Sequence, residues 1–307
     1  MQQVLALVNR AAGTADGGSV EAALTTRRGG ADVAVVTTGD AEELLRAETG
    51  RGDRQLVVIG GDRSVHAAVT ALDAVEGLDP GQPIGIIPLG TGNDLAQAIG
   101  LPLDPAVSAL VFLSGTPRRL DLVRDDTGGL VVNAVHLGGA GARAGAEAAR
   151  FKDRLGSATY PVGAVIAGVT TTGWPLRVEV DGRVVAHTDA GWTSDGAVDV
   201  LMVALCNGPT IGVPTPLAPD ALVDDGLVDV VVSTATGPVD RAAFAAALTA
   251  GRHVGRDDVV VVRGRQVTIR GAPVDLVADG ELEEAVDART WRVQHHVPGR
   301  CSSHAEA

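Results

Sequence analysis

The chain has 307 residues, of which 45% are hydrophobic, so it is long enough to form two domains with apolar cores. Aromatic residues make up only 2%, and those cores must therefore rest on Val, Leu, Ile and Ala. The net charge of −13 argues against broad nucleic-acid binding and against general attraction to anionic membranes.

The ends of the chain and its cysteines bear on the cellular compartment. The first residues, MQQVLALVNR, lack a charged region followed by a long apolar core, so we expect no signal peptide. We also find no apolar run of the length of a membrane span. The two cysteines are too few for a disulfide framework, which favours a reducing, cytoplasmic environment.

Strands and helices alternate through the first 120 residues. Apolar runs predict strands, and apolar residues at helical spacing or helix-capping residues predict helices. The expected strands cover residues 4–8, 33–37, 56–59 and 83–90, and the expected helices lie at residues 19–28, from 40, after 64, within 91–100 and from 105. Repeated strand–helix units imply an α/β domain over residues 1–120, with a parallel sheet covered by helices.

From about residue 120 the pattern changes to short β-rich runs. Examples are GLVVNAVHLG, PLRVEVDGRVVAH and DDVVVVRG, and the Asp181-Gly182 pair predicts a hairpin turn. Two helices are expected, near residues 141–155 and 239–251. We therefore predict a mainly antiparallel β-sandwich over residues 121–297 and a disordered tail over residues 298–307.

Three glycine-rich turns follow expected parallel strands, at the sheet edge where α/β proteins bind ligands. They read VNRAAGTADGG, GGDRS and PLGTGND. None of them matches the Walker A pattern or G-x-G-x-x-G. A tight turn often needs glycine for its geometry, so it is the presence of three such turns in one half of the chain that points to phosphate binding.

These turns resemble the diacylglycerol kinase catalytic family, which carries Gly-Gly-Asp-Gly-Thr and Pro-x-Gly-Thr-x-Asn-Asp loops. The segments VVNAVHLGGAGA, PDALVDDGL and LVADGEL resemble later motifs of the same family, in family order. The resemblance extends from Asn9 to Glu281, nearly the whole chain. It implies an N-terminal nucleotide domain like that of NAD kinases, a C-terminal β-sandwich for the acceptor, and an ATP-dependent lipid kinase acting on diacylglycerol or a related lipid.

The resemblance implies a set of nucleotide-binding residues, with Mg²⁺ as the accompanying cation. They are Asn9, Thr37, Thr38, Gly60, Gly61, Asp62, Arg63, Ser64, Val65, His66, Gly90, Thr91, Asn93 and Asp94. Asp62 is expected to face the magnesium ion. For Asp94 an equal alternative is that it caps its helix or orders the loop.

Asp279 and Glu281 are the candidates for the general base. They are two residues apart and would share one face of a strand, so that one takes the proton while the other tunes its pKa. The alternative is that Asp279-Gly280 forms an ordinary hairpin turn. The family position favours the catalytic interpretation.

The resemblance implies a second cation site at DALVDDGL. Asp225 would bind Mg²⁺ beside the carbonyl groups of Leu222 and Leu227, because hard cations take oxygen ligands. The alternative is a charged turn between two strands.

The chain departs from the family pattern on the nucleotide side. Arg63 replaces a glycine, Ser64 a threonine and Ala67 a glutamate, and Arg10 follows Asn9 where proline is usual. If position 63 needs a positive φ, the arginine strains the loop. Otherwise Arg63, with Arg10, is expected to clamp the triphosphate.

The sequence is compatible with three functions. The first is the lipid kinase. The second is a catalytically impaired relative with a lipid-binding or regulatory role, because of Arg63 and Ala67. The third is an NAD kinase-like enzyme with a soluble acceptor.

The expected partner is a lipid substrate met transiently at a membrane surface by a cytoplasmic protein. Arg143, Arg150, Lys152 and Arg154 form a basic segment that offers either a lipid contact or a solvated helix face. The sequence leaves a homodimer open.

Overall fold

The computed structural model describes residues 3–9, 32–38, 43, 46–47, 50, 52–75, 77–78, 82–138, 173–185, 198–212 and 215–303. The helices expected at residues 19–28 and 141–155 lie outside the described residues, and so does the basic segment within the second of them. Of the helix expected from residue 40, Glu43, Arg46 and Ala47 are helical.

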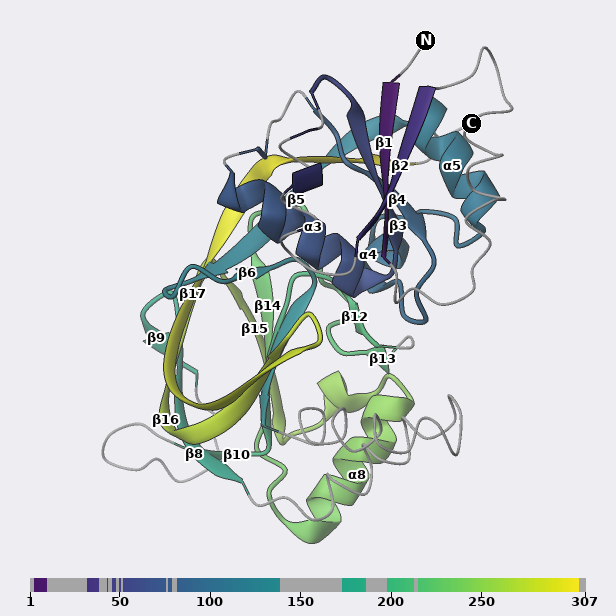
Figure 1. Cartoon of the computed structure of the whole chain (residues 1–307). Helices are drawn as coiled ribbons and strands as arrows, with labels where there is room; N and C mark the ends of the chain where they lie inside the picture. The colour runs from purple at the N-terminus through teal and green to yellow at the C-terminus, as the bar shows by residue number, and fades with distance from the viewer. Residues whose placement is uncertain are drawn as a thin grey trace.

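The first domain contains a sheet of four parallel strands (Figure 1). They are β1 (Gln3–Asn9), β2 (Asp32–Thr38), β3 (Gln55–Gly60) and β4 (Gly85–Pro88), in the order β2-β1-β3-β4. The parallel α/β architecture expected from the sequence is therefore confirmed.

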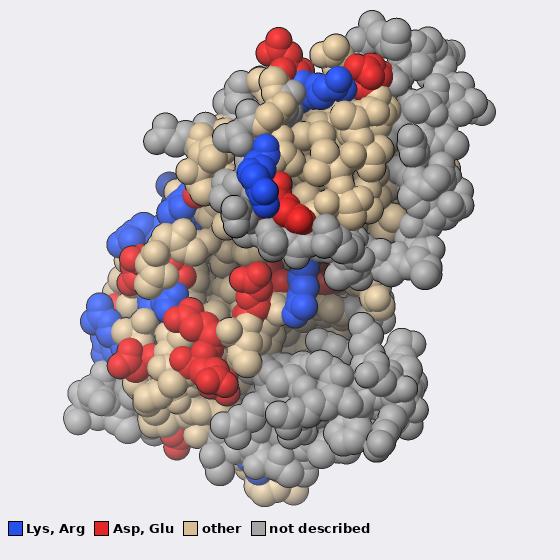
Figure 2. Space-filling view, in the orientation of Figure 1, with Lys and Arg blue, Asp and Glu red and all other residues tan. Residues whose placement is uncertain are grey.

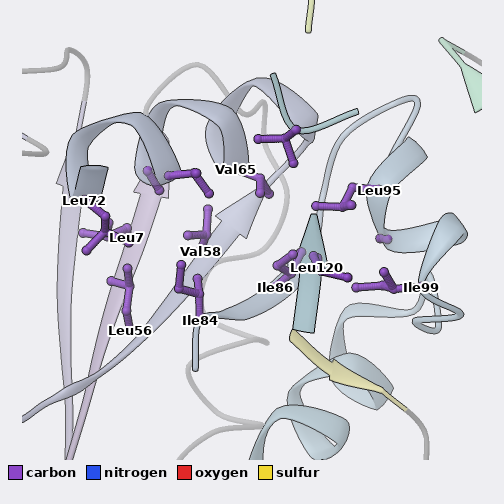
Figure 3. Packing of buried hydrophobic residues seen from close by; sticks show 14 of the residues in the cluster. Leu7, Leu56, Val58, Val65, Leu72, Ile84, Ile86, Leu95, Ile99 and Leu120 are labelled. Carbon is purple, nitrogen blue, oxygen red and sulfur yellow. The ribbon is translucent and has the colours of Figure 1, made fainter. Parts of the chain in front are cut away.

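Alternate residues of β1 belong to two different core clusters, each containing residues of the covering helices. Leu5 and Leu7 pack with buried residues of α3 (Asp62–Ala74) and α4 (Asp94–Ala98), as Figure 3 shows for Leu7 beside Leu72. Val4 and Ala6 pack instead with Ala109 and Phe112 of α5 (Pro105–Ser114). Because successive strand residues point to opposite faces, the two clusters mean that α3 and α5 cover opposite sides of the sheet.

The second domain is built on an eleven-stranded antiparallel sheet whose main path is β15-β14-β11-β7-β16-β17-β5-β6. In chain order its strands are β5 (Thr116–Asp125), β6 (Leu130–Val131), β7 (Ala134–Gly138), β8 (Trp174–Val180), β9 (Arg183–Val184), β10 (Val198–Val200), β11 (Met202–Cys206), β14 (Val228–Ser233), β15 (Val259–Gly264), β16 (Gln266–Ala278) and β17 (Glu281–Ser303). The predicted antiparallel β architecture is confirmed. Its core is mainly aliphatic, with Trp291 buried in one cluster and Phe244 in another.

Smaller elements complete this domain. They are β12 (Thr210–Ile211) paired with β13 (Thr215–Pro216), helix α8 (Pro238–Thr249) and the short helix η2 (His253–Gly255). Helix α8 confirms the helix expected near residues 239–251. The Asp181-Gly182 turn is also confirmed, since both residues have positive φ and join β8 to β9.

The two domains share structural elements, so the boundary near residue 120 is not sharp. Leu120, Leu122 and Val223 belong to the core cluster of the first domain. The last strand, β17, rises from the second domain to the first (Figure 1) and pairs with β5 as far as Ser303 opposite Thr116.

The expectation of a disordered tail over residues 298–307 was wrong for residues 298–303. That polar stretch continues β17 because the backbone of β5 offers it ladder partners, which the residue composition did not reveal. Residues 304–307 lie outside the described part of the chain.

The described surface carries charges of both signs. In the view of Figure 2, basic and acidic side chains lie beside one another over the second domain. Within the described residues, no helix is long and apolar enough to cross a membrane.

Candidate active site

The carboxyl ends of the four parallel strands lie together at one edge of the sheet. Asn9 is the register partner of Thr38, and Gly60 is that of Pro88. Thr38 is buried at the end of β2, whereas Thr37 is exposed. Ligands of open α/β sheets bind at this edge. The residues predicted to contact the nucleotide lie at, or just after, the ends of these neighbouring strands.

The turns after β3 and β4 pack directly against each other. A Cβ atom on Gly90 would lie 2.5 Å from the Cα of Gly61, so this approach needs glycine. Asn93, with φ of 53°, accepts from the Gly90 N–H and donates to the Gly90 carbonyl, each at 2.8 Å. Thr91 is exposed between them. Gly61, Gly90 and Asn93 therefore shape the loops, whichever ligand the loops bind.

The helix-capping contact that the sequence offered for Asp94 is made by Asp62. Asp62 Oδ1 accepts from the Leu95 N–H at 3.1 Å and so caps the short helix α4. Asp94 does not cap its own helix. Its carboxylate accepts from Thr210 Oγ1 at 2.9 Å and from the Gly212 N–H at 2.6 Å, and it thereby joins the first domain to the second.

The Asp62 and Asp94 carboxylates flank Gly92. A Cβ atom on Gly92 would lie 3.2 Å from Asp62 Oδ2 and 3.3 Å from Asp94 Oδ2. Burial and the nearby charge of Asp62 raise the pKa of Asp94, while its hydrogen bonds oppose that rise. Negative charge is thus concentrated at this edge, where a divalent cation would relieve it.

The backbone at position 63 has an ordinary helical conformation at the start of α3. Arg63 lies in the first helical turn and does not have a positive φ, so the arginine causes no strain of the kind a glycine position would suffer. The Ser64 N–H already donates to the Gly61 carbonyl at 2.9 Å within this turn. The Val65 side chain is buried in the core of the first domain, so it does not face the sheet edge.

Asp279 is held by donors from both domains. Its Oδ1 accepts from the backbone N–H groups of Asn133 and Ala134, each at 3.0 Å. Its Oδ2 accepts from the Val132 N–H at 2.6 Å and lies 2.9 Å from His66 Nδ1 of helix α3. An ionised carboxylate only accepts, so Nδ1 is the donor in this pair.

Arg63 contacts the same turn from the first domain. Its Nη2 donates to the Gly280 carbonyl at 2.5 Å. A Cβ atom on Gly280 would lie 3.0 Å from Arg63 Nε, so the arginine side chain lies against this glycine. Arg63 and His66 together hold the hairpin turn of Asp279 and Gly280 against the start of helix α3.

The expectation that Asp279 and Glu281 share one face of a strand was wrong. Ala278 pairs with Glu281, so Asp279 and Gly280 form a two-residue turn, and both have positive φ. The two carboxylates consequently differ in exposure. The Asp279 side chain is 2% exposed, and both of its oxygens accept hydrogen bonds, whereas Glu281 is exposed at the start of β17. The charge of Glu281 also contributes to the raised pKa of His66.

The contact between His66 and Asp279 predicts a pH dependence of stability. Burial opposes protonation of His66, but the hydrogen bond to Asp279 and the charges of Asp279 and Glu281 raise its pKa above 6.5. Protonated His66 therefore stabilises the folded state. This contribution is complete below pH 6.5, the pKa of an unfolded-state histidine, and is lost as the pH rises through the pKa of His66 in the folded state. We expect the Tm difference between the parent and His66→Gln to be largest near pH 6 and to shrink on the alkaline side. Thermal unfolding across this range checks it, and a difference that is constant with pH would contradict it.

The second predicted cation site has a different arrangement from the one the sequence suggested. Asp225 Oδ1 accepts from the Leu227 N–H at 3.0 Å, and Oδ2 forms an ion pair with Arg263. Arg263 also contacts Asp229 at 3.2 Å. Leu222 is 52% exposed on the same loop. Both carboxylate oxygens of Asp225 already have partners, and one of them is the guanidinium of Arg263. Asp225 is therefore poorly suited to be a magnesium ligand.

The contacts between the domains could not be read from the sequence. Thr210 and Gly212 bind Asp94, and Asn133 supplies one of the N–H groups that hold Asp279. The family-like order of the motifs was a usable signal, because segments that recur together along a chain can meet at one site. Which atoms meet was not visible from their spacing.

Comparison with known proteins agrees with this geometry. Residues 3–124 match the family described as "Diacylglycerol kinase catalytic domain", and residues 134–300 match "YegS C-terminal NAD kinase beta sandwich-like domain". "Probable lipid kinase YegS-like" of Stenotrophomonas maltophilia is 31% identical over 88% of this chain and 84% of its own. "Diacylglycerol kinase" of Mycobacterium tuberculosis is 28% identical over 91% and 89% of the two chains.

Solved structures share the fold. A diacylglycerol kinase from Bacillus anthracis superposes with a TM-score of 0.73 at 19% identity, covering 99% of this chain and 97% of its own. An NAD kinase from Archaeoglobus fulgidus, solved with ATP, gives a TM-score of 0.53 at 14% identity over 98% and 94%. The family resemblance of the glycine-rich loops is thus confirmed, and the chain belongs to the diacylglycerol kinase family of lipid kinases.

Proposed function

We propose that this protein is an ATP-dependent lipid kinase that transfers the γ-phosphate of ATP to a hydroxyl of diacylglycerol or a related lipid. The family supports the reaction class. The observation that carries the proposal is the position of the Asp279-Gly280 turn. His66 and Arg63 hold this turn against the start of helix α3, which follows the glycine turn after β3. A base at this turn would face both substrates.

Glu281 is the better candidate for the general base. A base needs an oxygen that is available to an incoming hydroxyl. The oxygens of Asp279 already accept hydrogen bonds from three backbone N–H groups and from His66, whereas Glu281 is exposed beside them. In this proposal Asp279 positions the turn, and Glu281 takes the proton of the lipid hydroxyl.

The chemistry then follows the general course of phosphoryl transfer. The lipid oxygen attacks the γ-phosphorus as Glu281 removes its proton, the bond to the bridging oxygen breaks, and ADP leaves with the electron pair. The turns after β3 and β4 would hold the phosphates, through backbone N–H groups at the start of helix α3 and through Thr91.

Asp62 fits the magnesium ion that such a reaction uses. Its Oδ1 is fixed by the Leu95 N–H, and within the described residues no hydrogen bond reaches its Oδ2. No group of three or more His, Cys, Asp or Glu side chains in the described part is placed to hold a metal. That agrees with a cation bound by one or two carboxylates and by the phosphates. When bound, it would neutralise charge on the transferred group.

The proposed reaction can be tested on the purified full-length protein. Radiolabelled ATP, MgCl₂ and mixed micelles containing diacylglycerol should give a labelled phospholipid, because the proposed base, Glu281, would lie beside the proposed phosphate site. Micelles without a hydroxyl lipid are the control. Labelled NADP from NAD, with no labelled lipid, would instead support the soluble-acceptor alternative. Lipid binding with no ATP binding would support the impaired relative.

A further inference from the structure

The loop of residues 220–227, called the acidic loop below, is anchored by contacts with the rest of the protein. Asp224 pairs with Arg118 at 2.8 Å, and the Gly226 N–H donates to buried Asp121 at 2.6 Å. Between them lies Asp225, the residue that the family resemblance assigns to a cation. Its neighbours are thus already fixed without a metal ion.

Arg263 supplies the positive charge at Asp225. It lies on β15 directly opposite Asp229 of the neighbouring strand β14, so the register of the sheet places it there. Its Nε lies 3.2 Å from Asp229 Oδ2, and its Nη2 donates to Asp225 Oδ2. The forked guanidinium therefore joins the acidic loop to the strand that follows it.

The burial of Asp229 makes this charge necessary. The Asp229 side chain is 4% exposed, and that of Asp225 is 22% exposed. Burial raises the pKa of Asp229, Arg263 opposes that rise, and the charges of Asp225 and Asp220 add to it. Two or more carboxylates this close need a nearby cation if they are to remain ionised.

A divalent cation and Arg263 would compete for the same place. Arg263 keeps its charge at any physiological pH, and an ion bound to Asp225 would stand beside it. Both oxygens of Asp225 are also engaged, one by Arg263 and one by the Leu227 N–H. A magnesium ion would have to displace the guanidinium from a carboxylate to bind.

We propose that Arg263 is a built-in substitute for the cation of the acidic loop. The folded protein then requires no divalent metal at Asp225, and any metal requirement of the enzyme arises with the nucleotide. This inference does not depend on which substrate the enzyme phosphorylates.

The test is thermal unfolding of the full-length protein without nucleotide, in EDTA and in millimolar MgCl₂. We expect the Tm of the parent to be the same in both. Arg263→Met should lower the Tm in EDTA, because it leaves a buried carboxylate without its partner, and MgCl₂ should recover part of the loss by binding the folded state. Arg265→Ala, an exposed arginine two residues along, is the control and should behave like the parent.

Asp225→Asn assigns any metal effect to this site. In the Arg263→Met background it should abolish the recovery by MgCl₂. In the parent background it should leave the Tm insensitive to MgCl₂, and this arm remains decisive if Arg263→Met does not fold. Stabilisation of the parent by MgCl₂ that disappears in Asp225→Asn would overturn the proposal.

Discussion

Replacing Glu281 by glutamine is expected to lower kcat by roughly 10²–10⁴-fold, the usual contribution of a general base. The amide has nearly the shape of the carboxylate but cannot accept the proton of the lipid hydroxyl. The affinity for ATP should change little, because Glu281 is assigned to the acceptor. Steady-state rates at saturating ATP and lipid, together with calorimetry of ATP binding, measure the two effects separately.

Glu284→Gln provides the matched control for this prediction. Glu284 is exposed, lies three residues along the same strand and undergoes the same chemical change. It should leave the rate near that of the parent. An unchanged rate in Glu281→Gln would remove Glu281 from the mechanism.

Asp279→Asn should lower both the Tm of the protein and its kcat. Hydrogen bonds to a charged group contribute roughly 1.5–3 kcal/mol each, and Asp279 accepts several in a buried position. An amide must also present its NH₂ group to a site built of donors. A low rate with an unchanged Tm would mean that Asp279 acts in catalysis directly, in place of the positioning role inferred from its contacts.

Much of the fold could be predicted from the sequence because it depends on local patterns. The alternation of Val4, Leu5, Ala6 and Leu7 between two helices requires nothing beyond apolar residues on both faces of a strand. The helix expected from residue 105 is α5, and the Asp104 side chain caps it by accepting from the Val107 N–H. The failure came at residues 298–303, where strand formation depends on a distant partner.

The contacts of the candidate site could not be predicted in the same way. His66 and Asp279 are 213 residues apart, and Arg63 and Gly280 are 217 apart. A long charged side chain can reach any acceptor that the tertiary fold brings within several ångströms, so its sequence context does not select one. The same reason explains why Arg263 was not foreseen as the partner of Asp225.

The arginine that replaces a family glycine can now be interpreted from its contact. The sequence predicted that Arg63 clamps the triphosphate of ATP, and the alternative is that it holds the turn of the proposed base. Its guanidinium instead has a described partner, the Gly280 carbonyl, beside the proposed base. A group that holds the base turn contributes to the rate, whereas a group that holds phosphate contributes to nucleotide affinity. The two roles therefore differ in a measurable way.

We expect Arg63→Ala to lower kcat by about ten-fold and to leave the dissociation constant of ATP nearly unchanged, because one hydrogen bond from an exposed charged group is lost. Arg63→Gly should behave alike, since position 63 needs no positive φ. Arg183→Ala, an exposed arginine on β9, is the control. Calorimetry and rates on the parent and the three variants check this. Weaker ATP binding in both Arg63 variants, with kcat retained, would restore the phosphate clamp. An absence of ATP binding by the parent that Arg63→Gly reverses would establish the impaired relative instead.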